Sequence, residues 1–129
     1  MGNGMVAAVS SRAEQAFHSD MLSGIERLKR EIGYTPTRFI QMVGEYGGVE
    51  AVHPILRGRD SSEGFTTLWE HRRLEMSCEA YVLLPWYANL FSEKERAVAR
   101  HRLDDHRFDV DTFVERASQN TPAWTDSQQ

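Results

Sequence analysis

Cysteine, proline and long apolar runs are all scarce in this chain of 129 residues, which has one cysteine and four prolines. With Cys78 as its single cysteine the chain cannot form an internal disulfide, and the apolar stretch around Cys78 predicts a buried, unreactive thiol. No apolar run approaches the roughly 20 residues of a membrane-spanning helix, and no basic start followed by an apolar region resembles a secretory signal. The sequence therefore predicts a cytoplasmic protein with no membrane partner.

A strong charge of either sign is also lacking. Lysine and arginine number 15, aspartate and glutamate 19, and the formal net charge is −4. The basic field typical of nucleic-acid-binding proteins is absent, so charge disfavours a nucleic-acid partner. The length suits one domain, which at this size buries enough surface to need neither a disulfide nor a metal.

Familiar catalytic motifs are missing as well. The chain has no Gly-x-Gly-x-x-Gly, no phosphate-binding loop, no Gly-x-Ser-x-Gly and no Cys-x-x-Cys. These absences favour a protein that is not an enzyme and that holds no cofactor.

Helical periodicity is what the chain does contain. Between Ser11 and Gly33, apolar residues recur at spacings of three and four, which predicts one long amphipathic helix. Ser11 and Glu14 have the spacing of a capping box, and Gly33 suits the helix end. The apolar positions of this helix are Phe17, Met21, Ile25, Leu28 and Ile32.

Two shorter helices are expected next. Thr35 suits an N-cap and Pro36 a first helical position, and Gly47-Gly48 should end that helix in a sharp turn. The following helix, over residues 49–56, contains Pro54, which predicts a kink or a 3₁₀ turn. Residues 57–63 should form a polar loop.

The stretch from Gly64 to Leu84 predicts two short helices joined by a tight turn. Thr67 and Glu70 have capping-box spacing, and Ser77 suits the N-cap of a second, largely apolar helix that Pro85 ends. Trp69 is expected in the core, where its replacement by alanine should cost about 3–5 kcal/mol.

Two more helices complete the pattern. Ser92 and Glu95 form a further capping-box pair, and Asp109 or Asp111 should start a last short helix.

No stretch shows the alternation of apolar and polar residues that is typical of a β-strand. The sequence therefore predicts an all-α fold: a single compact domain over residues 11–117, of five to seven mostly short helices with a helix–turn–helix-like central pair. A flexible segment, 1–10, and a disordered tail, 118–129, are expected to flank it, although Trp124 could dock on the domain.

Three groups of titratable residues have spacings found in metal or acid–base sites. A Glu-x-x-His pair is a unit of di-iron sites, but such sites need a second pair and further carboxylates. Zinc needs converging ligands, and a His–Asp pair does acid–base work only inside a pocket. The simpler interpretation of every group is a charged surface. The groups are Glu50 with His53; His71, Glu75 and Glu79; and His101, Asp104, Asp105 and His106.

Nucleic-acid binding by the central helix pair is one specific hypothesis. Arginines beside that pair could contact the phosphates of a nucleic acid. The start of the second helix, however, contains no arginine that could reach the edges of the bases. The arginines are Arg57, Arg59, Arg72 and Arg73.

An interaction or accessory module, self-associating as a homodimer, is the favoured interpretation. Tryptophan, tyrosine and arginine are enriched at interface hot spots, and the chain has aromatic residues outside its obvious stripes. A cryptic enzyme is the third interpretation. The candidate interaction surface comprises Arg57, Arg59, His71, Arg72, Arg73, Trp86 and Tyr87.

Three stretches together resemble a family of small bacterial all-helical proteins or domains. They are GYTPTRFIQMVGEYGGVEAV, GFTTLWEHRRLEMSCEAYVLL and LFSEKERAVARHRL, and they span Gly33 to about Leu103. The resemblance implies an all-helical fold in a bacterial cytoplasm, and no activity comes with it. Among its residues Glu79 is unusual, an acid that opens an apolar helix. It could favour the helix N-terminus or form a buried polar pair with Arg38 or Arg73.

Overall fold

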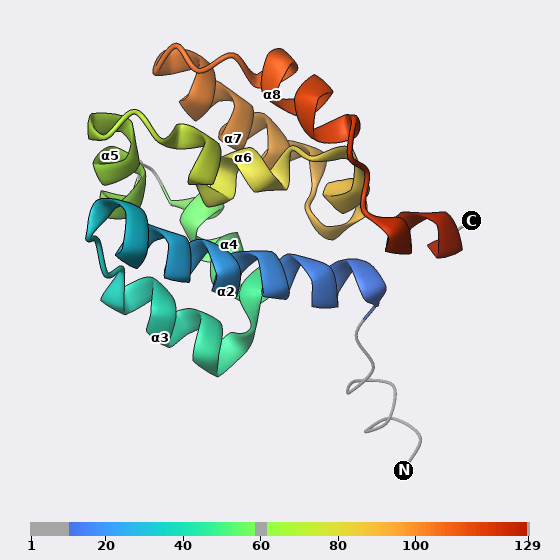
Figure 1. Ribbon diagram of the computed structural model, residues 1–129, viewed down its shortest axis with the longest axis horizontal. Helices are drawn as coiled ribbons and strands as arrows, with labels where there is room; N and C mark the ends of the chain where they lie inside the picture. The colour runs from blue at the N-terminus through green and yellow to red at the C-terminus, as the bar shows by residue number, and fades with distance from the viewer. Residues whose placement is uncertain (1–10, 59–61, 129) are drawn as a thin grey trace.

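Helix α4 (Gly48–Arg57) packs mainly against three other helices, α2 (Arg12–Ile32), α3 (Thr37–Tyr46) and α7 (Glu93–Asp105). A computed structural model describes residues 11–58 and 62–128, in which every regular element is helical (Figure 1). The all-helical, single-domain prediction is confirmed. The elements are α2 (Arg12–Ile32), α3 (Thr37–Tyr46), α4 (Gly48–Arg57), α5 (Glu63–Glu70), η1 (Leu74–Met76), α6 (Cys78–Val82), η2 (Pro85–Leu90), α7 (Glu93–Asp105), α8 (Val110–Ser118) and η3 (Ala123–Gln128).

The long helix α2 forms where the apolar stripe predicts it. Ser11 accepts a hydrogen bond from the Glu14 amide at 3.0 Å, and the Glu14 carboxylate accepts one from the Ser11 amide at 2.9 Å. This reciprocal pair satisfies two amides that the helix start leaves without partners. Gly33 ends the helix in the left-handed conformation, with φ of 67°. Four stripe residues are buried: Phe17, Met21, Ile25 and Leu28.

Two glycines bring α4 against α2. Gly47 has φ of 88°, which side-chain-bearing residues rarely adopt, and it turns the chain from α3 directly into α4. A Cβ on Gly48 would lie 2.8 Å from the His18 Cα, so a larger residue cannot fit. The Gly48 amide donates to His18 Nδ1 at 2.9 Å. The predicted turn at Gly47-Gly48 is therefore also a close helix contact.

Helix α7 holds α4 through Glu95. The Glu95 carboxylate completes the capping box of α7 by accepting from the Ser92 amide at 3.0 Å. Its other oxygen lies 2.6 Å from His53 Nδ1 and accepts from Arg57 Nε at 3.1 Å, and both of these residues belong to α4. Helix α4 remains α-helical through Pro54, so the predicted 3₁₀ turn does not form.

Two helix starts differ from the prediction. Ser62, not Thr67, caps α5 by accepting from the Phe65 amide at 3.1 Å, so the helix begins five residues earlier. Pro36 occupies the N-cap position of α3 without a side-chain hydrogen bond, and the helix begins at Thr37.

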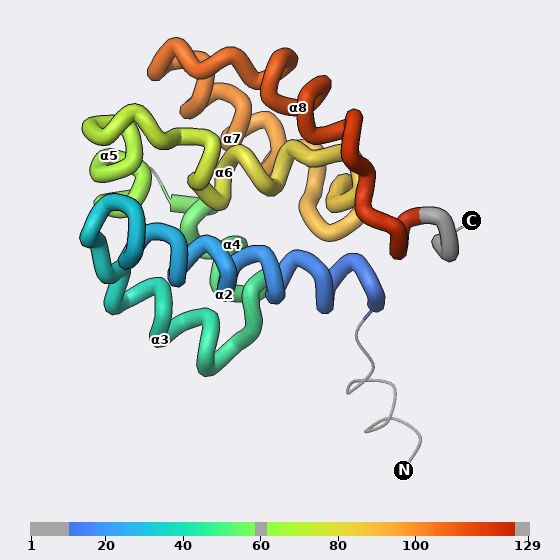
Figure 2. Tube along the Cα trace, viewed as in Figure 1, coloured from blue at the N-terminus to red at the C-terminus, as the bar shows by residue number. Residues whose placement is uncertain are grey.

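The C-terminal segment packs on the domain. Residues 123–128 form η3, and the Trp124 ring stacks on Tyr87 with centroids 6.1 Å apart and planes 27° apart. Tyr87 in turn donates from its hydroxyl to Asp20 of α2 at 2.6 Å. Figure 2 shows this last segment returning towards the start of α2. The sequence predicts a disordered tail from which Trp124 could dock; among the described residues of that tail, 123–128 form η3 and Trp124 contacts Tyr87. The predicted flexible segment 1–10 lies outside the described residues.

One main core extends from α2 to α8. Its most buried large side chains include Phe17, Phe65 and Tyr87, and Phe17 meets both Tyr87 and Phe91 edge-on at centroid distances of 5.0 and 5.2 Å. A smaller cluster of Ile25, Val43 and Ala51 joins α2, α3 and α4. None of the described helices has both the length and the apolar character needed to cross a membrane.

Acid should weaken the link between α4 and α7. Burial alone would raise the pKa of Glu95, but the Ser92 amide, His53 and Arg57 together lower it below its ordinary 4.5. A lowered folded-state pKa stabilises the fold above pH 4.5, and this contribution is lost as the pH falls through the folded pKa. In urea unfolding between pH 7 and pH 3, Glu95→Gln should therefore show a smaller loss of stability than the unaltered protein.

The matched control is Glu93→Gln, an exposed change in the same helical turn. Its stability should depend on pH as that of the unaltered protein does. Equal pH dependence of all three proteins would contradict the role given to Glu95.

Candidate functional site

The predicted interaction surface does not form one surface. Arg57 is exposed but pairs with Glu95, and Arg73 is held between Glu31 and Glu75, to which its Nε donates at 2.8 Å. Tyr87, which the sequence places on that surface, is 1% exposed and is a core residue. Trp86 is half-buried, and Arg59 lies outside the described residues.

Of the remaining two residues, Arg72 lines a surface hollow next to Trp69, whereas His71 is exposed and does not line it. The core prediction for Trp69 is wrong: its side chain is 48% exposed, because α5 turns Phe65 and Leu68 inward instead. An open groove of about 700 Å³, here called the Trp69 groove, runs between the ends of α5 and α7. It is lined by Trp69, Glu70, Arg72, Leu74, Glu75, His106, Arg107 and Phe108.

The second helix of the central pair lies inside the molecule. Helix α6 has five residues, of which Glu79, Ala80 and Val82 are buried, and its cap Ser77 is 2% exposed. A recognition helix must present the side chains at its start to a DNA groove. This geometry gives the helix–turn–helix hypothesis no support.

Glu79 forms the most deeply buried ion pair among the described residues. Its Oε2 accepts from Arg102 Nη1 of α7 at 3.3 Å, and the side chains are 1% and 8% exposed. Arg102 also donates to the carbonyls of Ile55 at 2.9 Å and Gly58 at 2.8 Å, at the end of α4. The predicted buried position of Glu79 is found, but its partner is neither Arg38, which is exposed, nor Arg73.

The titratable groups named from the sequence do not converge. His53 pairs with Glu95 and not with Glu50, and His101 pairs with Asp105 at 3.2 Å on an exposed face. His106 contacts the Arg102 carbonyl at 2.8 Å through Nδ1, which must be the protonated nitrogen because a carbonyl only accepts. No group of three or more potential metal ligands occurs in the described parts of the chain.

A second concavity lies between α2, α3, α5 and α6, with part of α4 in its wall. It has a volume of about 690 Å³, within the range of small-molecule sites. Most of its wall is apolar, and three methionines contribute to it. The main apolar lining residues are Met21, Ile25, Leu28, Phe39, Met42, Ile55, Phe65, Leu68 and Met76.

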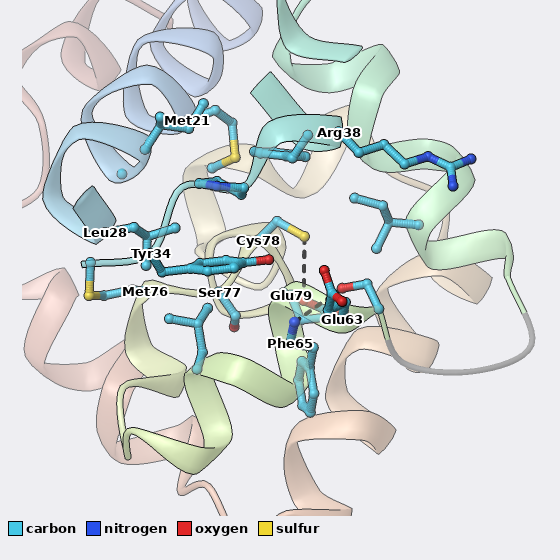
Figure 3. A pocket seen from close by; sticks show the side chains of 18 of the residues that line it. Met21, Leu28, Tyr34, Arg38, Glu63, Phe65, Met76, Ser77, Cys78 and Glu79 are labelled. Atoms are coloured by element: carbon cyan, nitrogen blue, oxygen red, sulfur yellow. Dashed lines mark hydrogen bonds between the residues drawn. The ribbon is translucent and has the colours of Figure 1, made fainter. Parts of the chain in front are cut away.

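Polar groups gather on one side of this cavity. Figure 3 shows the Tyr34 hydroxyl directed to the side where Cys78, Glu79 and Glu63 lie. The Cys78 thiol donates to Glu79 Oε1 at 3.3 Å. Burial, and then the Glu79 charge, raise the pKa of this thiol well above its ordinary value, so it stays protonated at neutral pH. Burial and the nearby Glu63 charge likewise raise the pKa of Tyr34.

Sequence reasoning missed this cavity because its wall comes from five helices, α2 to α6, which no local pattern brings together. The one local signal was Glu79, an acid at the start of an apolar helix. Met21, Met42 and Met76 gave no signal, since each has ordinary core spacing. Comparisons of the chain with family models, with curated proteins and with solved structures found no match.

Trp69→Ala should have little effect on stability. Because almost half of the side chain is exposed, we expect a loss of about 1 kcal/mol or less in urea unfolding. Phe65→Ala, in the same helix but 2% exposed, should cost about 3–5 kcal/mol. Similar losses for the two variants would show that Trp69 belongs to the core after all.

Proposed function

We propose that this protein is a non-enzymatic interaction module of a bacterial cytoplasmic system, and that it self-associates through the Trp69 groove. The observation that carries this proposal is the large aromatic side chain left 48% exposed in an open groove. Tryptophan is the residue type most often found at interface hot spots.

Neighbouring aromatic rings hold the Trp69 ring in place. It meets the His106 ring edge-on at a centroid distance of 5.1 Å, and His106 meets Phe65 of the core at 4.9 Å. His106 is itself oriented by its hydrogen bond to the Arg102 carbonyl. An aromatic residue that is already held in place loses little conformational entropy when a partner covers it.

Two arginines border the groove in an unusual backbone conformation. Arg72 and Arg107 have φ of 57° and 59°, and they are the only described residues other than glycine with positive φ. Each follows the histidine that ends its helix, α5 or α7. Glycine is the usual residue at such a position, so arginine there costs some stability. This cost is understandable if the exposed guanidinium groups contribute to binding.

The charges of the groove suit a second copy of the chain. Exposed Glu70 and exposed Arg72 lie close together in sequence beside Trp69, and Arg107 lies opposite. A two-fold dimer places the same patch on both sides of its interface, so a patch with both signs can pair with itself.

Light scattering coupled to size exclusion, at two protein concentrations, tests this proposal. The unaltered protein should be a dimer at the higher concentration, and Trp69→Ala should be a monomer at both. Tyr46→Ala is the matched control, since Tyr46 is 63% exposed but does not line the groove. This variant should dimerise normally.

A monomer at both concentrations, or equal dimerisation of all three proteins, would contradict the proposal. Adding duplex DNA at low salt to the same runs separates the nucleic-acid alternative. Co-elution with DNA that high salt abolishes would favour that alternative instead.

A further inference from the structure

The carboxylate of Glu79 has hydrogen-bonding capacity that the protein does not use. An ionised carboxylate can accept about four hydrogen bonds. At 1% exposure Glu79 receives only two among the described residues, one from Arg102 at 3.3 Å and one from the weak thiol donor of Cys78 at 3.3 Å. The contact with Arg102 is long for a charge-assisted hydrogen bond, and a thiol is only a weak donor. A buried carboxylate in this state would gain from a further donor.

Arg102 does not fully compensate Glu79. Its other contacts are with the carbonyls of Ile55 and Gly58, at 2.9 and 2.8 Å, both shorter than its contact with the carboxylate. The guanidinium is therefore shared between the end of α4 and Glu79. Glu79 lines the cavity and Arg102 does not, so the negative member of the pair faces the space that a ligand could occupy.

The other charged residues around the cavity leave a negative balance at its polar side. Glu63 is exposed and lies close enough to raise the pKa of Tyr34. Arg27 pairs with Glu31, which does not line the cavity. Asp20 accepts from the Tyr87 hydroxyl. In Figure 3 the guanidinium of exposed Arg38 is directed away from the carboxylates.

The rest of the wall suits an apolar body with an aromatic part. Tyr34, Phe39 and Phe65 line the cavity together with methionine side chains, which adapt to varied shapes. Aromatic faces next to carboxylates also favour a cation. The cavity is large enough for a molecule the size of an arylalkylamine or larger.

We propose that this cavity binds a small molecule with an apolar body and an ammonium group, whose N–H groups donate to Glu79 and whose charge is balanced by Glu79 and Glu63. Tyr34 supplies an aromatic face and a hydroxyl next to this group. The site shares no lining residue with the Trp69 groove, so it is independent of the self-association proposed above.

Isothermal titration calorimetry with two probes of similar shape and opposite charge tests the proposal. The probes are tryptamine and indole-3-propionate, titrated into the full chain at low salt and neutral pH. Tryptamine should bind, and indole-3-propionate should bind at least tenfold more weakly or not at all. Absence of tryptamine binding would overturn the proposal, and so would equal binding of both probes, which would indicate a merely apolar pocket.

Gly24 and Gly44 provide a matched pair of blocking and control variants. A Cβ at either position has open space within 4 Å, and both glycines lie inside helices, so a larger side chain does not clash at its root. Gly24 lines the cavity and Gly44 does not. Gly24→Phe should abolish tryptamine binding, and Gly44→Phe should retain it. Full binding to Gly24→Phe would show that tryptamine lies elsewhere and would overturn the assignment.

Two conservative variants test the carboxylates. Glu79→Gln keeps the shape of the side chain and should weaken tryptamine binding at least tenfold. Glu63→Gln changes an exposed residue, so the fold is not at risk, and it should weaken binding about threefold, in line with an exposed charge pair of roughly 0.2–1 kcal/mol. Glu45→Gln, an exposed change on α3 away from the cavity, is the control. Unchanged affinity in Glu63→Gln together with Glu79→Gln would overturn the role of the carboxylates.

Discussion

The buried pair of Glu79 and Arg102 is the interaction on which the arrangement of α4, α6 and α7 depends. Arg102 reaches from α7 to the last carbonyls of α4 and to the first turn of α6, so one guanidinium joins three helices. Removing a charged pair from water is costly, and the cost is recovered only with good hydrogen bonds. Arg102 recovers it through two backbone carbonyls, where a cation also suits the negative end of α4.

Because Arg102 shares its hydrogen bonds between α4 and Glu79, it also affects the cavity that Glu79 lines. Arg102 supplies enough positive charge to keep a carboxylate in the interior, yet its shorter hydrogen bonds go to α4. Glu79 is thus held in place by its helix and by Arg102, and it also lines the cavity. The binding role that we propose for Glu79 would therefore add to its structural role, whereas the Trp69 groove, at the ends of α5 and α7, is built from other residues.

What could be predicted from the sequence was local. The stripe of α2, the capping boxes at Ser11 and Ser92, and the cap at Ser77 depend on residues three or four apart, and all were found where expected. Contacts across many residues could not be predicted. Glu79 was recognised as unusual, but its partner lies 23 residues away on another helix.

Trp69 is a second example of what local sequence patterns do not predict. Its helix has three large apolar residues within five positions, and periodicity alone does not say which of them face inward. The earlier start of α5 at Glu63, set by Ser62, turns Phe65 and Leu68 into the core and leaves Trp69 outside. The cavity depends on five separate helices, and no local pattern encodes it. Function was less accessible than fold, because both candidate surfaces arise from such distant contacts.

A double-mutant cycle on Glu79 and Arg102 tests the central claim most directly. Urea unfolding of Glu79→Gln, Arg102→Met and the double variant gives the coupling free energy of the two side chains. If the pair joins the three helices, each single change leaves a buried partner unsatisfied, and the double variant should be more stable than the sum of the single losses predicts, by about 2–3 kcal/mol. Additive losses, within about 0.5 kcal/mol, would show that the two residues act independently and would contradict this account.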